Sequence, residues 1–259
     1  MTEINKTLYI PLYGKAYVSS RGIILDDKRA EEIWQSAELK LSGKAKSKWL
    51  AYYMGMRSRV FDEWVRHKTG EGEHTVIHVG CGLDSRATRV GLPCGIWYDV
   101  DFPSVIEERR RHFAESERYR MICGDIREDE WLDSISCVDS CILIMEGVSM
   151  YLSADELSSF LGRIAEKFGK VSLLMDCYTS FAARASKYKN PINDVGVRSV
   201  FGIDEPRSLE NGGLRYIREH NMTPDYLIDE LSGIERAVFC KVYGGRMSKR
   251  LYRLYEYEK

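Results

Sequence analysis

The spacing of apolar residues along the chain changes near Gly70. In residues 25–64 they recur every three or four positions among good helix formers, as in AEEIWQSAELKL, which predicts helices. After Gly70, short apolar runs alternate with longer amphipathic stretches. This alternation is typical of βαβ units, so we expect an α/β fold with a mainly parallel sheet and a helical N-terminal extension.

Five apolar runs predict the parallel strands of this sheet. They are residues 75–79, 95–100, 119–123, 141–145 and 171–175. Pro103 favours a helix after the second strand, because the first turn of a helix does not need the N–H that proline lacks. Ser153 and Glu156 form a capping-box pattern, which predicts a helix that begins there and ends near Phe168.

The end of the chain predicts a β-hairpin. Residues 235–243 and 250–257 are rich in strand-forming residues and are separated by GGRMSK. Aromatic and charged residues alternate with a period of two in LYRLYEYE, which favours an amphipathic strand over a nucleic-acid-binding tail. We therefore expect seven strands, with an antiparallel hairpin at the C-terminus.

We expect one domain over residues 1–259, because no repeat, low-complexity tract or linker divides the chain. Its predicted parts are a helical N-terminal cap, a ligand-binding core, a substrate cover and a C-terminal helix with the hairpin. They cover residues 1–70, 71–178, 179–213 and 214–259. The cover has weak periodicity and many polar residues, so we expect an irregular segment over the strand ends, where specificity is often set.

Composition and charge narrow the kinds of partner. The 259 residues are 44% hydrophobic with a net charge of -1, which does not provide the clustered positive charge that nucleic acid or anionic lipid requires. The run from Arg109 to Arg111 is expected to be a solvated helix face. No apolar run approaches the roughly 18 residues of a membrane span, and the first residues lack a signal-peptide pattern.

The seven cysteines form no C-x-x-C pair and are odd in number. We therefore expect neither a metal site nor a complete disulfide framework, as in a reduced cytoplasm. A cytoplasmic protein with a small-molecule or peptide partner fits these observations, while the oligomeric state is left open.

Candidate chemistry lies after the strands, because ligands of open α/β sheets bind at the carboxyl ends of the strands. The first strand ends in Gly80, Cys81 and Gly82, where glycines allow a ligand to approach the backbone and the next helix offers free N–H groups. Asp84 is expected to be an acid that caps this helix or lies in its first turn.

Acidic residues follow the next three strands. Asp101 lies roughly 20 residues beyond the glycine turn, where a ribose-binding acid belongs. Asp99 shares its face, but we favour Asp101 because it stands at the edge of the strand. Two interpretations of Asp125 are open: a simple loop acid, or an acceptor of a hydrogen bond from an adenine amino group whose ring is covered by Ile126. Glu146 follows a buried strand and must have a partner there, because an isolated buried carboxylate is costly.

A dinucleotide-binding site would share the turn and the ribose acid. However, Ser85 occupies the third glycine position of the G-x-G-x-x-G fingerprint, which weakens the case for nicotinamide or flavin. Glu146, which follows the fourth strand, also favours a ligand other than a dinucleotide. So does the terminal hairpin.

Five motifs occur in a fixed order in residues 56–152. They are MRSRVFDEWV, HVGCGLDSRATRV, YDVDFPSV, CGDIREDEW and MEGVSMYLS. In this order they resemble the leucine carboxyl methyltransferase and polyketide O-methyltransferase family, whose members are class I S-adenosylmethionine-dependent methyltransferases. Ser58 stands where that family usually has threonine.

The resemblance implies a Rossmann-like class I methyltransferase fold that binds S-adenosylmethionine. Arg57 would hold the methionine carboxylate and Glu146 the methionine ammonium, pairings that suit the charges of these groups. Asp101 would bind the ribose. The cofactor-binding positions that it implies, with the glycine turn, are Arg57, Gly80, Cys81, Gly82, Asp101, Asp125, Ile126 and Glu146.

The resemblance ends near Leu152, so the methyl acceptor is predicted from chemistry alone. A carboxylate is already ionised near neutral pH, whereas a hydroxyl would want a base. No histidine is a clear candidate for this base. His78 lies within a strand, where we expect a core residue, and His112 lies on a charged helix. We therefore favour a small carboxylate over a hydroxyl, with Tyr151 and Tyr178 lining the acceptor pocket.

Two alternatives to an O-methyltransferase stay open at this point. One is a nicotinamide-dependent oxidoreductase. The other is a non-catalytic protein that binds S-adenosylmethionine as a sensor.

Overall fold

The computed structural model describes residues 3–38, 41, 43–70, 72–92, 94–136, 140–189 and 200–259. Its centre is a seven-stranded sheet with the order β3-β2-β1-β4-β5-β7-β6. The strands are β1 (Glu73–Val79), β2 (Cys94–Asp101), β3 (Tyr119–Cys123), β4 (Ser140–Met145), β5 (Lys170–Tyr178), β6 (Arg215–His220) and β7 (Tyr252–Glu258). β1 to β5 are parallel, and β7 runs antiparallel between β5 and β6. The mainly parallel seven-stranded sheet was predicted from the sequence.

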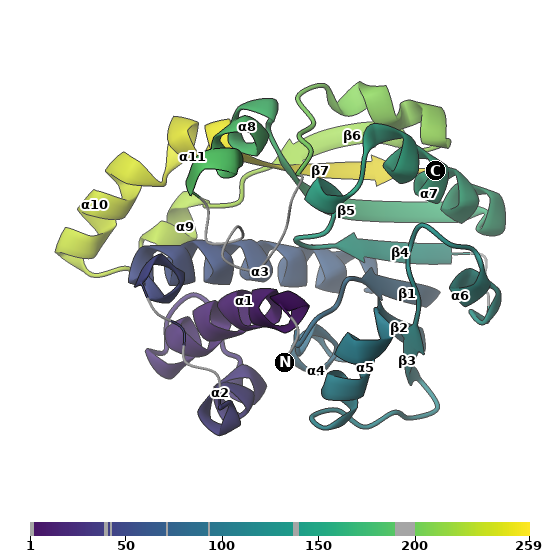
Figure 1. Ribbon diagram of the computed structural model, residues 1–259, viewed down its shortest axis with the longest axis horizontal. Coiled ribbons are helices and arrows are strands. Elements are labelled where there is room, and N and C mark those ends of the chain that lie inside the picture. Colours follow the sequence, from purple (N-terminus) through teal and green to yellow (C-terminus); the bar gives the residue numbers. More distant parts are fainter. Residues whose placement is uncertain are drawn as a thin grey trace.

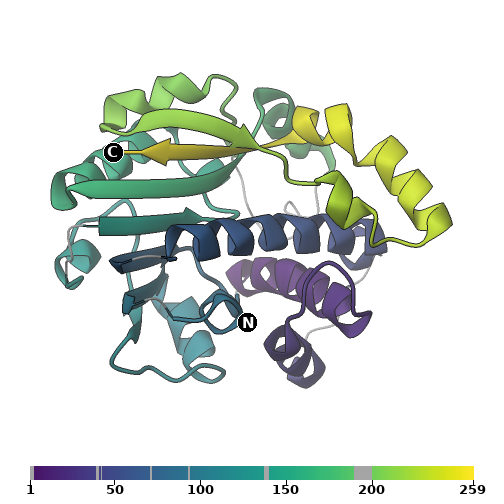
Figure 2. The ribbon, with the colours of Figure 1, turned by 180° about the vertical axis from the view of Figure 1, so that it is seen from behind.

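Helices cover both faces of this sheet (Figures 1 and 2). They are α1 (Glu3–Ser20), α2 (Lys28–Ser36), α3 (Lys48–Lys68), α4 (Arg86–Val90), α5 (Pro103–Arg110), α6 (Glu130–Asp133), α7 (Ala154–Lys167), α8 (Ser180–Lys189), α9 (Asp225–Ile228), α10 (Gly233–Val242) and α11 (Gly245–Leu251). The short 3-10 segments are η1 (Gly43–Lys46), η2 (Ser149–Tyr151) and η4 (Pro206–Gly212). No helix in the described ranges combines the length and apolarity needed to cross a bilayer.

Alternating residues of the central strands supply two separate apolar cores. Ile144 of β4 is buried with Phe61 of α3, whereas the neighbouring Leu143 is buried with Leu161 of α7 on the opposite face. Since successive side chains of a strand point to opposite faces, each central strand can be apolar throughout. α3 and α7 are accordingly seen on opposite sides of the sheet in the two views (Figures 1 and 2).

Local signals set several helix starts as predicted. Ser153 and Glu156 form both hydrogen bonds of a capping box at the start of α7. Pro103 occupies the first turn of α5.

The predicted first strand of the terminal hairpin is wrong. Residues 235–243 lie almost wholly in α10, and β7 pairs instead with β6, where Tyr216 lies opposite Tyr257. Phe239 of α10 is fully buried, and its ring lies 6.3 Å from that of Tyr52 in α3. Packing against α3 therefore overrides the strand propensity of this segment.

The predicted irregular cover at 179–213 is in part helical. Residues 180–189 form α8, and residues 190–199 lie outside the described residues. Thr179 directly precedes α8, and its hydroxyl accepts a hydrogen bond from the N–H of Ala182. Ala182 and Ala183 are buried against Tyr178. Two buried alanines and a helix cap favour a helix where low periodicity had indicated none.

Arg109 does not lie on a solvated face, contrary to the prediction. It is fully buried, pairs with Asp99, and donates hydrogen bonds to the Gly82 carbonyl at 2.9 Å and to the Tyr119 hydroxyl at 3.1 Å. Arg111 does face solvent. Arg109 thus links α5 to β2, β3 and the turn after β1.

We expect Arg109→Ala to lower the free energy of unfolding by about 3–5 kcal/mol, because Asp99 would remain as a buried charge without its partner. Burial alone would raise the pKa of Asp99, but Arg109, assisted by His78 and Tyr119, holds it at about 2. Urea unfolding followed by circular dichroism measures the loss. Arg111→Ala is the control and should change stability by less than about 0.5 kcal/mol; similar values for both variants would contradict the assignment.

Candidate functional site

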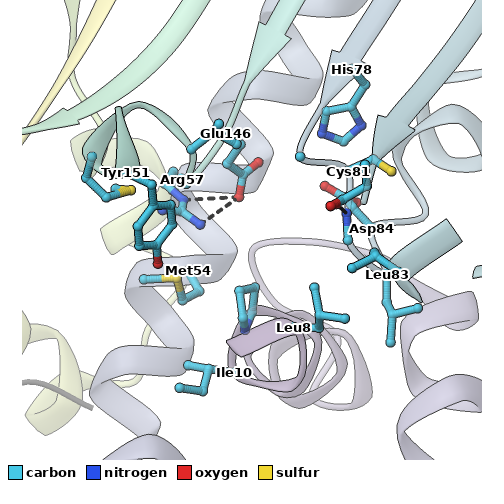
Figure 3. Close-up of a pocket in the computed structure, with 18 of the residues that line it drawn as sticks. Leu8, Ile10, Met54, Arg57, His78, Cys81, Leu83, Asp84, Glu146 and Tyr151 are labelled. Carbon is cyan, nitrogen blue, oxygen red and sulfur yellow. Dashed lines mark hydrogen bonds and ion pairs between the residues drawn. The ribbon is translucent and has the colours of Figure 1, made fainter. Parts of the chain in front are cut away.

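A cavity of about 710 Å³ lies at the carboxyl ends of β1 to β5. Its size is typical of a small-molecule site. Figure 3 shows Arg57 and Glu146 on one side, Cys81 and Asp84 on the other, and α1 with Leu8 below them. The N-terminal helices therefore form one side of a site that lies at the carboxyl edge of the sheet.

The turn after β1 brings backbone to the cavity surface. Gly80 and Gly82 have φ angles of +61° and +52°, in the left-handed region that favours glycine. A Cβ on Gly80 would lie 2.2 Å from a methyl carbon of Val148, so a larger residue would not fit. Cys81 lies between these two glycines. Burial raises the pKa of its thiol well above the usual value, so the thiol stays protonated.

Asp101 lines the cavity, whereas Asp99 does not. The two carboxylate oxygens of Asp101 accept hydrogen bonds from the N–H groups of Gly82 and Phe102, each at 2.8 Å. Burial raises the pKa of Asp101, and these two donors oppose that effect. Asp99 is instead held in the core by Arg109. Of the two candidate acids, Asp101 alone is therefore placed to meet a ligand.

The predicted pair after β3, Asp125 and Ile126, also lines the cavity. Asp125 is bound by Arg127, whose Nε lies 2.9 Å and 3.0 Å from the two carboxylate oxygens. This hydrogen bonding lowers the pKa of Asp125. Arg127 and Phe102 also line the cavity, although no sequence pattern predicted them.

Arg57 and Glu146 form a buried ion pair (Figure 3). Arg57 Nε and Nη2 both lie 3.0 Å from Glu146 Oε1. Arg57 Nη1 also lies 2.7 Å from an oxygen of Asp176, whose other oxygen accepts the N–H of Gly147 at 2.6 Å. Asp176 therefore fixes both the guanidinium and the turn that carries Glu146.

This ion pair is part of a larger buried charge cluster. It joins four cations and five carboxylates, which leaves one negative charge in excess. Its members are Lys15, Asp27, Arg57, Asp62, Asp84, Arg86, Arg89, Glu146 and Asp176. Burial by itself would raise the pKa of Glu146, but the positive charges of Lys15, Arg86 and Arg57 lower it to about 2.

Asp84 belongs to this cluster. The prediction that it caps α4 or lies in its first turn is wrong. Ser85 occupies the N-cap position, while Asp84 lies 2.7 Å from Lys15 Nζ and 2.8 Å from Arg89 Nη1. Lys15, which reaches the turn from α1, was not predicted from the sequence. The pairing joins residues far apart in the chain, so no local spacing could reveal it.

His78 is buried within β1, as expected, and also borders the cavity. Its Nδ1 lies 3.4 Å from Asp99 Oδ1. In the part of the chain that the structure describes, no group of three or more His, Cys, Asp or Glu side chains is arranged to hold a metal ion.

The end of the cavity beyond Arg57 is apolar and aromatic. Tyr151 and Tyr178 both line it, and the hydroxyl of Tyr151 points toward Met54 (Figure 3). Tyr178 is buried with its ring 4.5 Å from that of Tyr252 in an edge-on arrangement. Burial raises the pKa of Tyr151, so its hydroxyl stays protonated and can donate a hydrogen bond.

Two solved structures that contain SAH have a similar arrangement of strands and helices. Magnesium protoporphyrin IX methyltransferase (ChlM) from Synechocystis PCC 6803, with bound SAH, is 13% identical, with a TM-score of 0.52 over 95% of this chain and 97% of that chain. Mycolic acid cyclopropane synthase CmaA1 is 12% identical, with a TM-score of 0.51 over 79% and 85%. The fold is the Rossmann-like class I methyltransferase fold.

Sequence comparison identifies the family. The family model for leucine carboxyl methyltransferase matches residues 10–165. Tetracenomycin polyketide synthesis O-methyltransferase TcmP of Streptomyces glaucescens is 29% identical over 243 residues, 92% of this chain and 90% of that protein. The S-adenosyl-L-methionine-dependent methyltransferase dpfgK of Gibberella zeae is 27% identical over 253 residues, 87% and 85%. The chain belongs to the leucine carboxyl methyltransferase family, which removes the oxidoreductase alternative.

The low pKa of Glu146 predicts how its contribution to stability depends on pH. Its folded pKa of about 2 lies below the ordinary 4.5, so the contribution is complete above pH 4.5 and is lost as the pH falls toward 2. We expect Glu146→Gln to be destabilising at pH 7, with a deficit that shrinks by about 1 kcal/mol at pH 4. Urea unfolding of both proteins at the two pH values measures this, and a deficit independent of pH would contradict it.

Proposed function

We propose that the chain transfers a methyl group from S-adenosylmethionine to an oxygen of a small carboxylic acid and releases S-adenosylhomocysteine. The observation that carries the proposal is the arrangement of Asp101 at the glycine turn and the Arg57–Glu146 pair around one cavity. Family membership supports the same reaction.

The charges around the cavity fit this cofactor. S-adenosylmethionine carries a carboxylate, an ammonium and a sulfonium, a net charge of +1. Arg57 suits the carboxylate, and Lys15 offers a second cation near it. Glu146 suits the ammonium.

The adenosine end also finds suitable groups. Asp101 keeps free lone pairs for the ribose hydroxyls, since each of its oxygens accepts one backbone N–H. Asp125 would accept the adenine amino group, and Ile126 and Phe102 offer apolar surface for the ring. Gly80 allows close approach of the backbone.

Bound S-adenosylmethionine would supply an electrophilic methyl group on sulfur, so the chain need only position the acceptor oxygen and exclude water. The aromatic end of the cavity supports a carboxylate acceptor. Among its described lining residues there is no histidine, aspartate or glutamate to serve as a base. Tyr151 and Tyr178 are proposed to contact the acceptor.

We further propose that the enzyme acts in the cytoplasm on a small molecule, and not on nucleic acid or a membrane. The net charge of -1 supports this, because neither of those partners would find a broad cationic surface.

We expect Arg57→Ala to weaken S-adenosylmethionine binding by about 1–3 kcal/mol or more, because the methionine carboxylate would lose its charged partner. Titration calorimetry measures the affinity, with circular dichroism to verify folding. Arg59→Ala is the control on the same helix, since Arg59 pairs with Glu63 at the surface. Arg57→Lys keeps the charge and should lose less. Unchanged affinity in Arg57→Ala would remove this assignment.

We expect single-turnover methyl transfer to a carboxylate acceptor to stay nearly flat from about pH 6 to 8, because a carboxyl with a pKa near 4 is already ionised. A hydroxyl acceptor would give a rate that rises through this range. A panel of acids and phenols with radiolabelled S-adenosylmethionine tests this, since alkali cleaves methyl esters and spares ethers. Alkali-stable products formed at a steeply rising rate would defeat the carboxylate proposal. Cofactor binding without transfer to any acceptor would favour a non-catalytic role.

A further inference from the structure

We propose that residues 221–251, between β6 and β7, form the wall that selects the methyl acceptor, and that Tyr243 limits acceptors to apolar aromatic acids of restricted length. This inference rests on the proposed function, because it concerns the acceptor of that reaction. We call residues 221–251 the hairpin insertion.

The hairpin insertion departs from what the sheet requires. β6 and β7 are antiparallel neighbours, and such strands can be joined by a two-residue turn. Here α9, α10 and α11 intervene and extend beyond the end of the sheet, beside the first turns of α3 (Figures 1 and 2). The extra chain therefore lies next to the aromatic end of the cavity.

Two sets of contacts hold the insertion in place. In α10, Glu235 accepts hydrogen bonds from Lys48 Nζ and the Tyr52 hydroxyl, each at 2.8 Å. At the other end, the Thr179 hydroxyl donates to the Arg250 carbonyl at 2.7 Å, and the Thr179 N–H donates to the next carbonyl at 3.1 Å. The insertion is thus fixed to α3 on one side and to the end of β5 on the other.

Tyr243 is held as a rigid part of this wall. Its ring stacks on Phe239 at 5.5 Å and 26°, and lies nearly parallel to Trp49 at 6.3 Å and 16°. It also lines the cavity, as does Leu251 at the end of α11. Turning this ring aside for a longer ligand would lose its contacts with Phe239 and Trp49.

The rest of this end of the cavity is apolar or aromatic apart from Ser186. Its surfaces come from α3, η2, β5, α8 and the start of β7, and the described lining residues here are Leu50, Tyr53, Met54, Met150, Tyr151, Tyr178, Ala182, Ala185, Ser186 and Tyr252. None of these carries a full charge near neutral pH, and Arg57 is the cation at the inner end. An acceptor that fits would turn its acid group toward the methyl group of the bound cofactor and place a planar apolar body among the tyrosine rings.

The outer face of α10 supplies a matched control. Val242 adjoins Tyr243 in sequence but is 45% exposed and does not line the cavity. Removing its side chain alters the same insertion without altering the proposed acceptor wall.

The test measures binding and does not depend on turnover. Benzoate, 2-naphthoate and anthracene-2-carboxylate are titrated calorimetrically into protein saturated with S-adenosylhomocysteine. We expect Tyr243→Ala to raise the affinity for anthracene-2-carboxylate relative to benzoate by about tenfold or more, because the end of the cavity is opened. Tyr243→Phe, which keeps the ring, and Val242→Ala should keep the wild-type ratio.

Affinity for S-adenosylhomocysteine should be the same in all variants, since none touches its proposed site. If Tyr243→Ala does not fold, Leu251→Ala is the second test, because it removes a different side chain from the same wall. An unchanged ratio in the folded wall variant, or no binding of any of the three acids to wild type, would overturn the inference. If wild-type protein fails to bind S-adenosylhomocysteine, the proposed function on which this inference rests would be overturned instead.

Discussion

The buried pairing of Arg57 with Glu146 is the interaction on which the site depends. It joins α3 to the turn after β4, and Asp176 adds the end of β5. Charges buried this deeply are tolerated only when each has a partner, so the positions of three elements are fixed together. The same pairing divides the cavity into a charged part beside the glycine turn and an aromatic part beyond it.

The sheet explains why these two parts meet. β1 to β5 are parallel, so their carboxyl ends share one edge, and each end contributes a different group to the cavity. α1 then covers this edge and brings Lys15 to Asp84. Groups from segments far apart in the chain, including Arg57 of α3, thereby border one cavity.

Much of the sheet and of its edge could be predicted from the sequence, because the signals are local. Apolar runs ending in Gly80, Asp101 and Glu146 mark strands and the residues that follow them. Long-range partners carry no such signal: Lys15 reaches Asp84 across most of the N-terminal region. The segment around Phe239 has strand-like composition, and only its packing against α3 makes it a helix. Arg109 was likewise placed among surface arginines, although its partner Asp99 lies in a neighbouring strand.

The position of the hairpin insertion has an evolutionary consequence. It joins the last two strands at the edge of the sheet, whereas Gly80, Asp101 and Glu146 follow strands in the middle. Mutations, and even gains or losses of residues, can therefore accumulate in the insertion while the central strand ends stay intact. A lineage carrying this chain can diversify one wall of the cavity by changes in a single short stretch of its gene.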